Sequence, residues 1–178
     1  LSEKELAALR LTRFGFVFQQ AHLMTTLCLL DNIVLPGFLA GLRPRPEVTA
    51  RGKELMERMG IAELAASGVT EVSGGQLQRA GICRALINDP GIVFADEPTG
   101  ALNSATALQI LDLLGEVHAS GTTLVMVTHD AQVAARADRV LVLVDGRIEE
   151  DLRLGRYRET EAPARLVSVT EALQRRSV

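Results

Sequence analysis

The sequence predicts an α/β fold with a mostly parallel sheet, because strand-like and helix-like segments alternate along it. Residues 91–96 (GIVFAD) form an almost unbroken apolar run, which is typical of a parallel strand buried on both faces. Residues 122–128 (TTLVMVT) have the same character, and residues 104–119 between them carry apolar side chains at helical spacing. The length of 178 residues fits one domain, or one domain with a tail.

The N-terminal part contains one short strand and a stretch of helix punctuated by loops. Residues 1–13 are charged and amphipathic, and residues 13–19 (RFGFVFQ) predict a short buried strand. The prolines and glycines of residues 36–46 predict a loop-rich stretch. Thr49 is expected to cap a helix that runs to about Met59, with Gly60 as its C-terminal stop.

A second helix is predicted to begin at Ser73. Ser73 and Gln76 have the spacing of a capping box, and Asp89-Pro90 ends the helix. Further on, residues 131–137 suit a short helix, and residues 139–148 predict a hairpin around the Asp145-Gly146 turn. From Glu149 onward the chain becomes polar, and residues 167–176 predict at most a weak helix or a frayed tail.

Composition argues against some classes of function. The net charge of −3, the aromatic content of 3% and the absence of Trp do not favour a nucleic-acid partner. Cys28 and Cys83 have no metal-ligand spacing and are expected to be small buried hydrophobes in a reducing cytosol. No secretory signal opens the chain, and the apolar stretch 27–42 is too short and too interrupted to span a bilayer. A membrane role would therefore require a partner.

Two short motifs carry candidate chemistry. Asp96 and Glu97 follow an apolar strand, where a parallel sheet presents polar groups to ligands, and such carboxylates suit Mg²⁺ binding and activation of water. Ser73-Gly74-Gly75-Gln76 opens a helix, whose free N–H groups and dipole favour a phosphate. Taken alone, the first motif is more often a solvated turn and the second a capped helix. The longer string SGGQxQRxxIxRAL is far more specific.

In combination, these strings resemble the ATPases of ABC transporters. SGGQLQR, FADEPTGALNS and VMVTHD are similar to the signature motif, the Walker B motif with its D-loop, and the switch histidine of that family, in the same order. FGFVFQQ resembles the Q-loop, and the similarity covers residues 14–148. The resemblance implies a RecA-like core of residues 14–19 and 89–150, a helical subdomain of residues 20–88, and a tail of residues 151–178.

The resemblance also implies roles for individual residues. Asp96 and Gln19 would bind Mg²⁺, Glu97 would be the general base, and His129 would contact the γ-phosphate, with Gln19 also near the attacking water. A second set would close over ATP held by another ATPase subunit in a head-to-tail dimer: Ser73, Gly74, Gly75, Gln76 and Asn103. His22 and His118 match no motif and are expected at the surface.

The chain departs from the family pattern in three places. Val72 stands where the signature usually begins with Leu, and Asn103 stands where most D-loops have Asp. No G-x-x-x-x-G-K-[ST] phosphate-binding loop occurs, so we expect an N-terminally truncated domain whose isolated chain has little ATPase activity and tends to self-associate.

Within the family, the chain is similar to the branch of macrolide exporters, lipoprotein-release complexes and bacitracin-type exporters, and PTGALNS favours the last. The resemblance then implies a membrane-embedded permease partner, which residues 24–42 would meet unless they only fill the subdomain core, and a place at the cytoplasmic face of the membrane. Two alternatives stay open: a non-catalytic paralogue that acts as a dimerisation or regulatory module, and a soluble ABC-type ATPase of DNA repair or translation.

Overall fold

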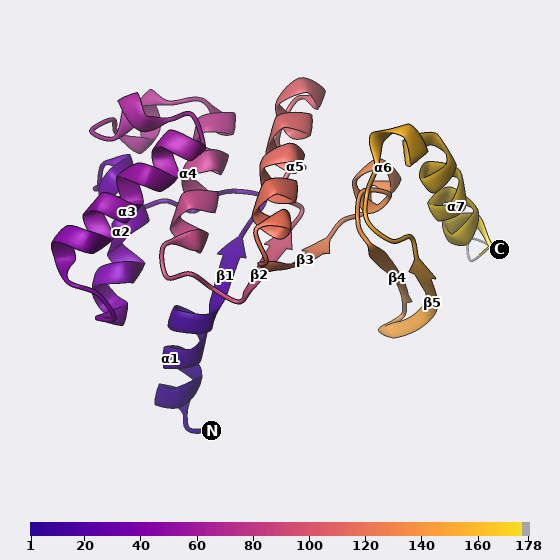
Figure 1. Ribbon diagram of the computed structural model, residues 1–178, viewed down its shortest axis with the longest axis horizontal. Coiled ribbons are helices and arrows are strands. Elements are labelled where there is room, and N and C mark those ends of the chain that lie inside the picture. Colours follow the sequence, from indigo (N-terminus) through magenta and orange to yellow (C-terminus); the bar gives the residue numbers. More distant parts are fainter. Residues whose placement is uncertain (176–178) are drawn as a thin grey trace. The chain divides into compact units, whose positions relative to one another are not determined.

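The computed structural model describes residues 1–175, which fold into two compact units (Figure 1). The first unit is Leu1–Val127 and the second is Thr128–Val178, and each is considered by itself. The first unit contains a parallel sheet with helices packed on it, and the second contains a β-hairpin with helices. The predicted division into a core, a helical subdomain and a tail stays a prediction.

The first unit is organised by a three-stranded parallel sheet in the order β1-β2-β3. These strands are β1 (Phe14–Val17), β2 (Ile92–Asp96) and β3 (Thr123–Val127). Val17 lies opposite Ala95, and Asp96 lies opposite Val127. The sheet confirms the α/β class and the three strands predicted around residues 13–19, 91–96 and 122–128, with each strand slightly shorter than expected.

The two faces of this sheet differ in burial. Alternate residues, among them Val17, Val93 and Ala95, are buried in a core shared with α4 (Gly74–Leu86) and α5 (Ser104–Ala119). On the opposite face, the Phe16 and Phe94 rings stack with centroids 5.6 Å apart, which supports the β1–β2 register. The expectation that β2 and β3 are buried on both faces is therefore wrong for β3, since Val127 is 62% exposed.

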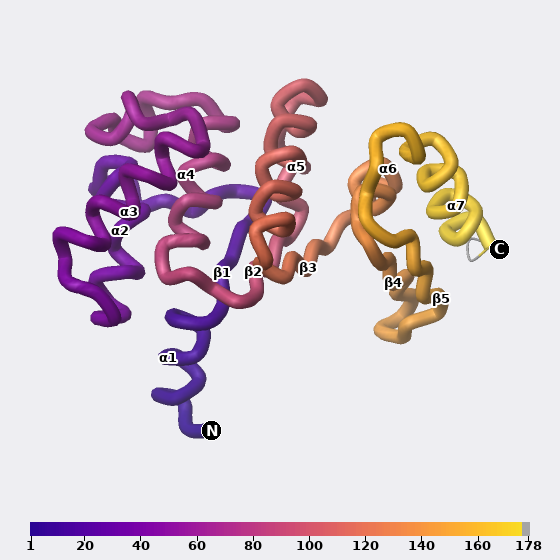
Figure 2. Tube along the Cα trace, in the orientation of Figure 1, coloured from indigo at the N-terminus to yellow at the C-terminus, as the bar shows by residue number. Residues whose placement is uncertain are grey.

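Between β1 and β2 the chain makes a long helical excursion. Figure 2 shows it leaving β1, running to the cluster of α2 (Leu29–Ala40) and α3 (Arg45–Arg58), and returning through α4 to β2. Two short 3₁₀ turns, η1 (Ala62–Leu64) and η2 (Val69–Glu71), join α3 to α4. Before β1, residues predicted only as a charged amphipathic segment form α1 (Glu3–Arg13), which Ser2 and Glu5 begin with a capping box.

Two helices differ from the sequence-based prediction. Residues 36–40 of the stretch expected to be loop-rich belong to α2, which continues through Pro36. A proline inside a helix removes one backbone hydrogen bond, but burial of Leu29 and Ile33 in the core holds this helix together. The next helix, α3, begins at Arg45 and not at Thr49, because Pro46 suits a first-turn position. The predicted end of this helix before Gly60 is confirmed, and Gly60 has a φ of 66°.

The second unit is a hairpin with two helices. It contains α6 (Ala131–Ala134), β4 (Arg139–Val144), β5 (Arg147–Arg153), η3 (Glu159–Glu161) and α7 (Ala162–Gln174). The antiparallel pairing of β4 with β5 confirms the predicted hairpin. The segment expected to be a weak helix or a frayed tail is a regular helix with Pro163 in its first turn and Val169 buried. Position 176 of that expectation lies outside the described residues.

The two cysteines differ in burial. Cys83 is buried, and this burial raises the pKa of its thiol to about 12, whereas Cys28 is only partly buried and caps α2. In the part of the chain that the structure describes, no helix combines the length and apolarity needed to cross a bilayer.

The close contact between α2 and α3 depends on Gly52. A Cβ added to Gly52 of α3 would lie 2.6 Å from Val34 Cγ1 of α2, whereas a Cβ added to Gly115 of α5 would meet nothing within 4 Å. We expect Gly52→Ala to destabilise the fold by about 1–3 kcal/mol through overpacking. Gly115→Ala should stabilise it by about 0.5–1 kcal/mol, because alanine loses less backbone entropy in a helix.

Urea unfolding followed by circular dichroism measures both changes. The two variants add the same methyl group within a helix, so equal shifts of the two midpoints in the same direction would contradict the predicted close packing of α2 on α3.

Candidate functional site

The carboxyl ends of the three parallel strands define one edge of the sheet. β1 ends at Val17, β2 at Asp96 and β3 at Val127, and the register brings Asp96 opposite Val127. Gln19 follows β1 by two residues, and its side chain is exposed, as is that of Asp96. Polar groups at this edge of an open α/β sheet are in the position where such folds bind ligands.

Glu97 has a strained backbone immediately after β2. Its φ is 43°, in the left-handed region, which costs roughly 1–2 kcal/mol for a residue other than glycine. Two main-chain hydrogen bonds hold this conformation: Glu97 N–H donates to the Val127 carbonyl at 3.0 Å, and the Glu97 carbonyl accepts from Gly100 N–H at 3.0 Å. Backbone strain that neighbouring elements hold in place is common at functional sites.

Gln19 lies against the segment that follows β2. A Cβ added to Gly100 would be 2.9 Å from Gln19 Nε2, so the amide of Gln19 occupies the space that the glycine leaves open. The structure therefore brings together two of the predicted site elements, the residue after β1 and the segment 97–100 after β2. The absence of a side chain at Gly100 is what permits this approach.

Gln78 connects three parts of the site and was not singled out by the sequence analysis. Its side chain, 3% exposed, projects from α4, and Nε2 donates to the Phe18 carbonyl at 2.9 Å and to the Pro98 carbonyl at 2.8 Å. These carbonyls belong to the segments that carry Gln19 and Glu97. Gln78 is four residues before buried Ile82, so a polar residue on the apolar face of a helix was the available signal.

The beginning of α4 lines a pocket with the beginning of α5. Ser73 caps α4: its Oγ accepts from Gln76 N–H at 3.4 Å, and Gln76 Oε1 accepts from Ser73 N–H at 2.8 Å, which confirms the predicted capping box. Asn103 caps α5 through Oδ1. The pocket has a volume of about 420 Å³, and its lining includes the four predicted residues Ser73, Gly74, Gly75 and Gln76 together with Asn103.

Glycine is required at the α4 terminus on steric grounds. A Cβ on Gly75 would lie 2.6 Å from Thr106 Cγ2 of α5. The two helices therefore approach closely where the free N–H groups and the positive end of the α4 dipole meet the pocket. This arrangement can accept an anion such as a phosphate.

His129 belongs to the second unit, two residues beyond the end of β3 in sequence. It is exposed and lies between Thr128, whose Oγ1 accepts from Asp130 N–H at 3.1 Å, and Asp130, which caps α6. The roles that the resemblance implies for Asp96, Glu97 and His129 stay a prediction. His22 and His118 are exposed, as expected.

Two arginines on α4 also hold the surroundings of the site and were missed by the sequence analysis. Arg84 donates to the Ala21 and His22 carbonyls at 2.6 and 2.9 Å, and loss of hydration on burial lowers the pKa of its guanidinium. Arg79 donates to the Met59 carbonyl at 2.7 Å, beside the pocket. Neither contact has a local sequence signal, because each partner lies at least 20 residues away.

Comparison with known proteins identifies the family. The family model described as "ABC transporter" matches residues 2–100, more than half of the chain. The chain therefore belongs to the ABC transporter family, as its motifs indicated. This family membership implies nucleotide binding.

Particular relatives point to one branch of the family. The chain is 46% identical over 155 residues to a protein named macrolide export ATP-binding/permease protein MacB 1/2 of Paracoccus denitrificans, covering 87% of this chain and 23% of that protein. A MacB of Rhodopseudomonas palustris is 44% identical over 174 residues, covering 98% of this chain and 26% of its own length. The chain thus spans about a quarter of these curated relatives.

A solved structure is similar in fold as well as in sequence. It is the dimeric ATP-binding cassette MJ0796 in a post-hydrolysis state with ADP and Pi, with a TM-score of 0.77 and 37% sequence identity. The match covers 88% of this chain and 69% of that chain. This match confirms the predicted RecA-like cassette fold.

The connection made by Gln78 yields a second test. Gln78→Met keeps the volume and removes both donated hydrogen bonds, which leaves the buried Pro98 carbonyl and the part-buried Phe18 carbonyl without this partner. We expect a loss of about 2–3 kcal/mol in the free energy of unfolding. Gln174→Met on the exposed side of α7 is the matched control and should change it by no more than about 0.5 kcal/mol.

Chemical denaturation of the two variants and the parent chain measures these energies. Hydrogen exchange should also increase at residues 18–20 and 97–100 in the Gln78 variant only. Equal stability of both variants would show that the Gln78 amide does not hold these segments.

Proposed function

We propose that the chain is the ATP-binding and ATP-hydrolysing part of a membrane ABC exporter. The observation that supports this most strongly is the joining of the Gln19 segment, the Asp96-Glu97 segment and α4 through the buried amide of Gln78. Family membership supports the same reading. The Gln78 amide connects the segments that carry Gln19 and Glu97 to α4, the helix that begins after Ser73.

The residues at the sheet edge fit a magnesium ion bound with a nucleotide. The described residues contain no group of three His, Cys, Asp or Glu side chains that would hold a metal alone. Mg²⁺ in nucleotide sites needs only one or two protein ligands, because phosphates and water complete its shell. Asp96 and Gln19 would hold it, and its charge would offset that of the phosphates during transfer.

The remaining predicted residues have separate tasks in this proposal. Glu97 would accept a proton from the attacking water, and His129 would donate a hydrogen bond to the γ-phosphate. Ser73, Gly74, Gly75, Gln76 and Asn103 would contact the ATP held by a second cassette, so that the pocket between α4 and α5 closes over the nucleotide of the opposite subunit. Asn103 in place of the usual Asp would alter communication between the two sites without abolishing hydrolysis.

The proposed partners follow from the relatives. MJ0796 is described as dimeric, which supports a head-to-tail pair of cassettes. The MacB relatives are named as combined ATP-binding and permease proteins, which supports a permease partner and a position at the cytoplasmic face of the membrane. Macrolide export is accordingly the branch we favour; the preference for bacitracin-type exporters that PTGALNS gave draws no support from these two relatives.

The isolated chain is proposed to hydrolyse ATP poorly, because none of its residues forms a G-x-x-x-x-G-K-[ST] sequence. That loop supplies the main-chain N–H groups and the lysine that hold the β- and γ-phosphates. The lack of this sequence also supports the alternative function, a non-catalytic dimerisation or regulatory module.

The general-base proposal is tested by Glu97→Gln in the protein expressed from its complete gene. Loss of a general base should lower kcat for ATP hydrolysis by about 10²–10⁴-fold and leave KM nearly unchanged. Glu116→Gln, on the exposed side of α5, is the matched control. A wild-type kcat in the Glu97 variant would overturn the assignment.

The inactivity of the isolated chain is tested separately by a phosphate-release assay on the purified 178-residue protein. We expect no turnover above that of its own Glu97→Gln variant. Hydrolysis that Glu97→Gln abolishes would contradict this proposal. If the complete gene encodes only these residues and its product is inactive, the non-catalytic alternative is the better function.

A further inference from the structure

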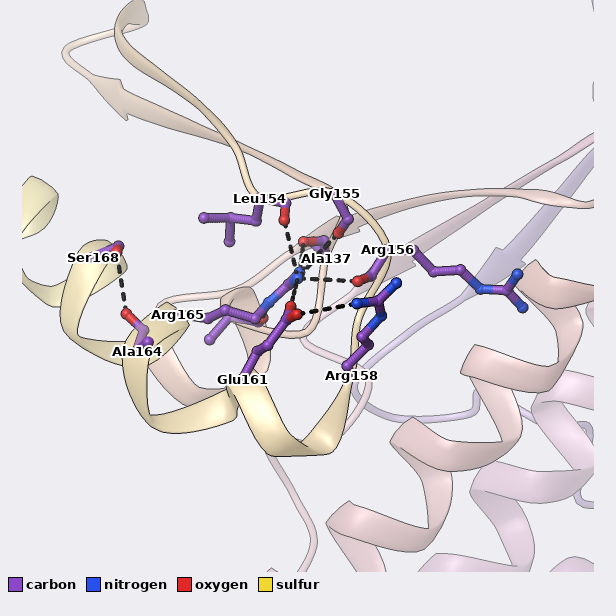
Figure 3. Close-up of polar contacts among 10 residues, drawn as sticks. Ala137, Leu154, Gly155, Arg156, Arg158, Glu161, Ala164, Arg165 and Ser168 are labelled. Atoms are coloured by element: carbon purple, nitrogen blue, oxygen red, sulfur yellow. Dashed lines mark hydrogen bonds and ion pairs between the residues drawn. The ribbon is translucent and has the colours of Figure 1, made fainter.

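Arg165 of α7 has a buried guanidinium that is satisfied almost entirely by main-chain carbonyls. The residue is 5% exposed, yet the nearest carboxylate oxygen, from Glu161, is 4.0 Å away. Figure 3 shows its head group surrounded by carbonyl oxygens from different segments of the second unit. A buried charge of this kind is stable only when its donors are all used.

The hydrogen bonds of Arg165 join two segments of the chain. Nε donates to the Ala135 carbonyl at 2.8 Å, and Nη2 donates to the Ala137 carbonyl at 2.7 Å. The other bonds reach the loop after β5, at the carbonyls of Leu154, Gly155 and Arg156, at distances of 3.1 to 3.3 Å. Arg165 also lies over the Tyr157 ring, 5.4 Å from its centroid.

Ala135 is the C-cap of α6, the helix that follows His129, and Ala137 lies three residues beyond the end of that helix. α6 contains only four residues, and a helix so short has no stability of its own. Its carbonyl end is held by Arg165, and buried Val133 and Ala135 add apolar contacts. Its N-terminal end is capped by Asp130, whose Oδ1 accepts from Gln132 N–H at 2.7 Å.

His129 therefore immediately precedes Asp130, the N-cap of a helix whose C-terminal end is held by α7. Asp130 bonds back to Thr128 Oγ1, so the three residues 128–130 form one hydrogen-bonded start to α6. A change that releases the C-terminal end of α6 would also release residues 128–130, because a helix of four residues is too short to be stable by itself. The guanidinium is suited to this task since its planar fork reaches several carbonyls at once.

We propose that Arg165 is a positioning residue that fixes the His129 segment through α6, and that α7 is thereby part of the catalytic apparatus. The functional half of this inference rests on the role proposed above for His129. Arg165 touches no substrate. It determines how narrowly the backbone of residues 128–131 is held, and with it the geometry that the imidazole can adopt.

The test uses Arg165→Lys, which keeps the charge but has no planar fork, with Arg175→Lys as the matched control. Arg175 is the C-cap residue of α7 and pairs at the surface with Glu150 at 3.1 Å. Hydrogen exchange and ring signals of the three histidines are recorded by NMR on the chain. Arg165→Lys should reduce the hydrogen-exchange protection of residues 131–137 by about tenfold. This corresponds to a decrease of ~1.4 kcal/mol in the free energy of local opening.

The same variant should change the His129 ring signals and leave those of His22 and His118 in place. Protection in β4 and β5 should stay within about twofold of the parent. Unchanged His129 signals, or a loss of protection as large in the hairpin as in α6, would overturn the proposal. Arg165→Met, which removes the charge, should give a larger effect in the same direction, and an effect no larger than that of Arg175→Lys counts against it.

Kinetics distinguish this inference from the function on which it rests. In the protein from the complete gene, Arg165→Lys should lower kcat about fivefold at constant KM for ATP, as expected when only transition-state contacts are affected. If Glu97→Gln has no effect while the NMR changes occur, the positioning stands and the ATPase assignment fails. If Glu97→Gln lowers kcat and Arg165→Lys does not, the positioning role fails alone.

Discussion

The candidate site depends on the buried amide of Gln78. Three segments that are distant in sequence, around Phe18, Gln78 and Pro98, meet through its two hydrogen bonds. Main-chain carbonyls buried without partners are costly, so this side chain both requires and enforces their arrangement. Because Gln78 is on the helix that begins at Ser73, movement of α4 is coupled to the segments that carry Gln19 and Glu97.

Side-chain donors also bind main-chain carbonyls elsewhere in the molecule. Arg51, Arg79, Arg84 and Arg165 all donate to main-chain carbonyls at the ends of helices or in loops. The last carbonyls of a helix have no intrahelical partner, and a guanidinium can satisfy several at once. Short helices and irregular connections near the proposed site are therefore held by specific polar contacts, in addition to the apolar core.

Membership of the ABC family and the geometry of the first unit support each other. The family explains why a glycine-led helix start, an acidic strand end and a glutamine after β1 occur in one chain. The geometry adds how they are joined: Gly100 makes room for the Gln19 amide, and Gly75 lets α4 approach α5. The strained backbone at Glu97, held by Val127 and Gly100, fixes the turn out of β2.

Prediction from sequence succeeded where the signal was local. The capping box of Ser73 and Gln76, the apolar run of β2 and the Asp145-Gly146 hairpin are each specified by a few adjacent residues, and each was predicted correctly. Prediction failed where local signals opposed tertiary packing. Pro36 argued for a loop, but burial of the residues around it makes the segment helical.

Spacing along the chain was sufficient to predict the fold class, the family and the candidate site residues. The contacts of the folded chain were needed to show that Gln78 joins two strand ends, that Gln19 lies against Gly100, and that Arg165 holds the end of α6. Each of these contacts pairs residues that are far apart in sequence. A polar side chain gives no sign of its partner until packing has brought the two together and excluded water from between them.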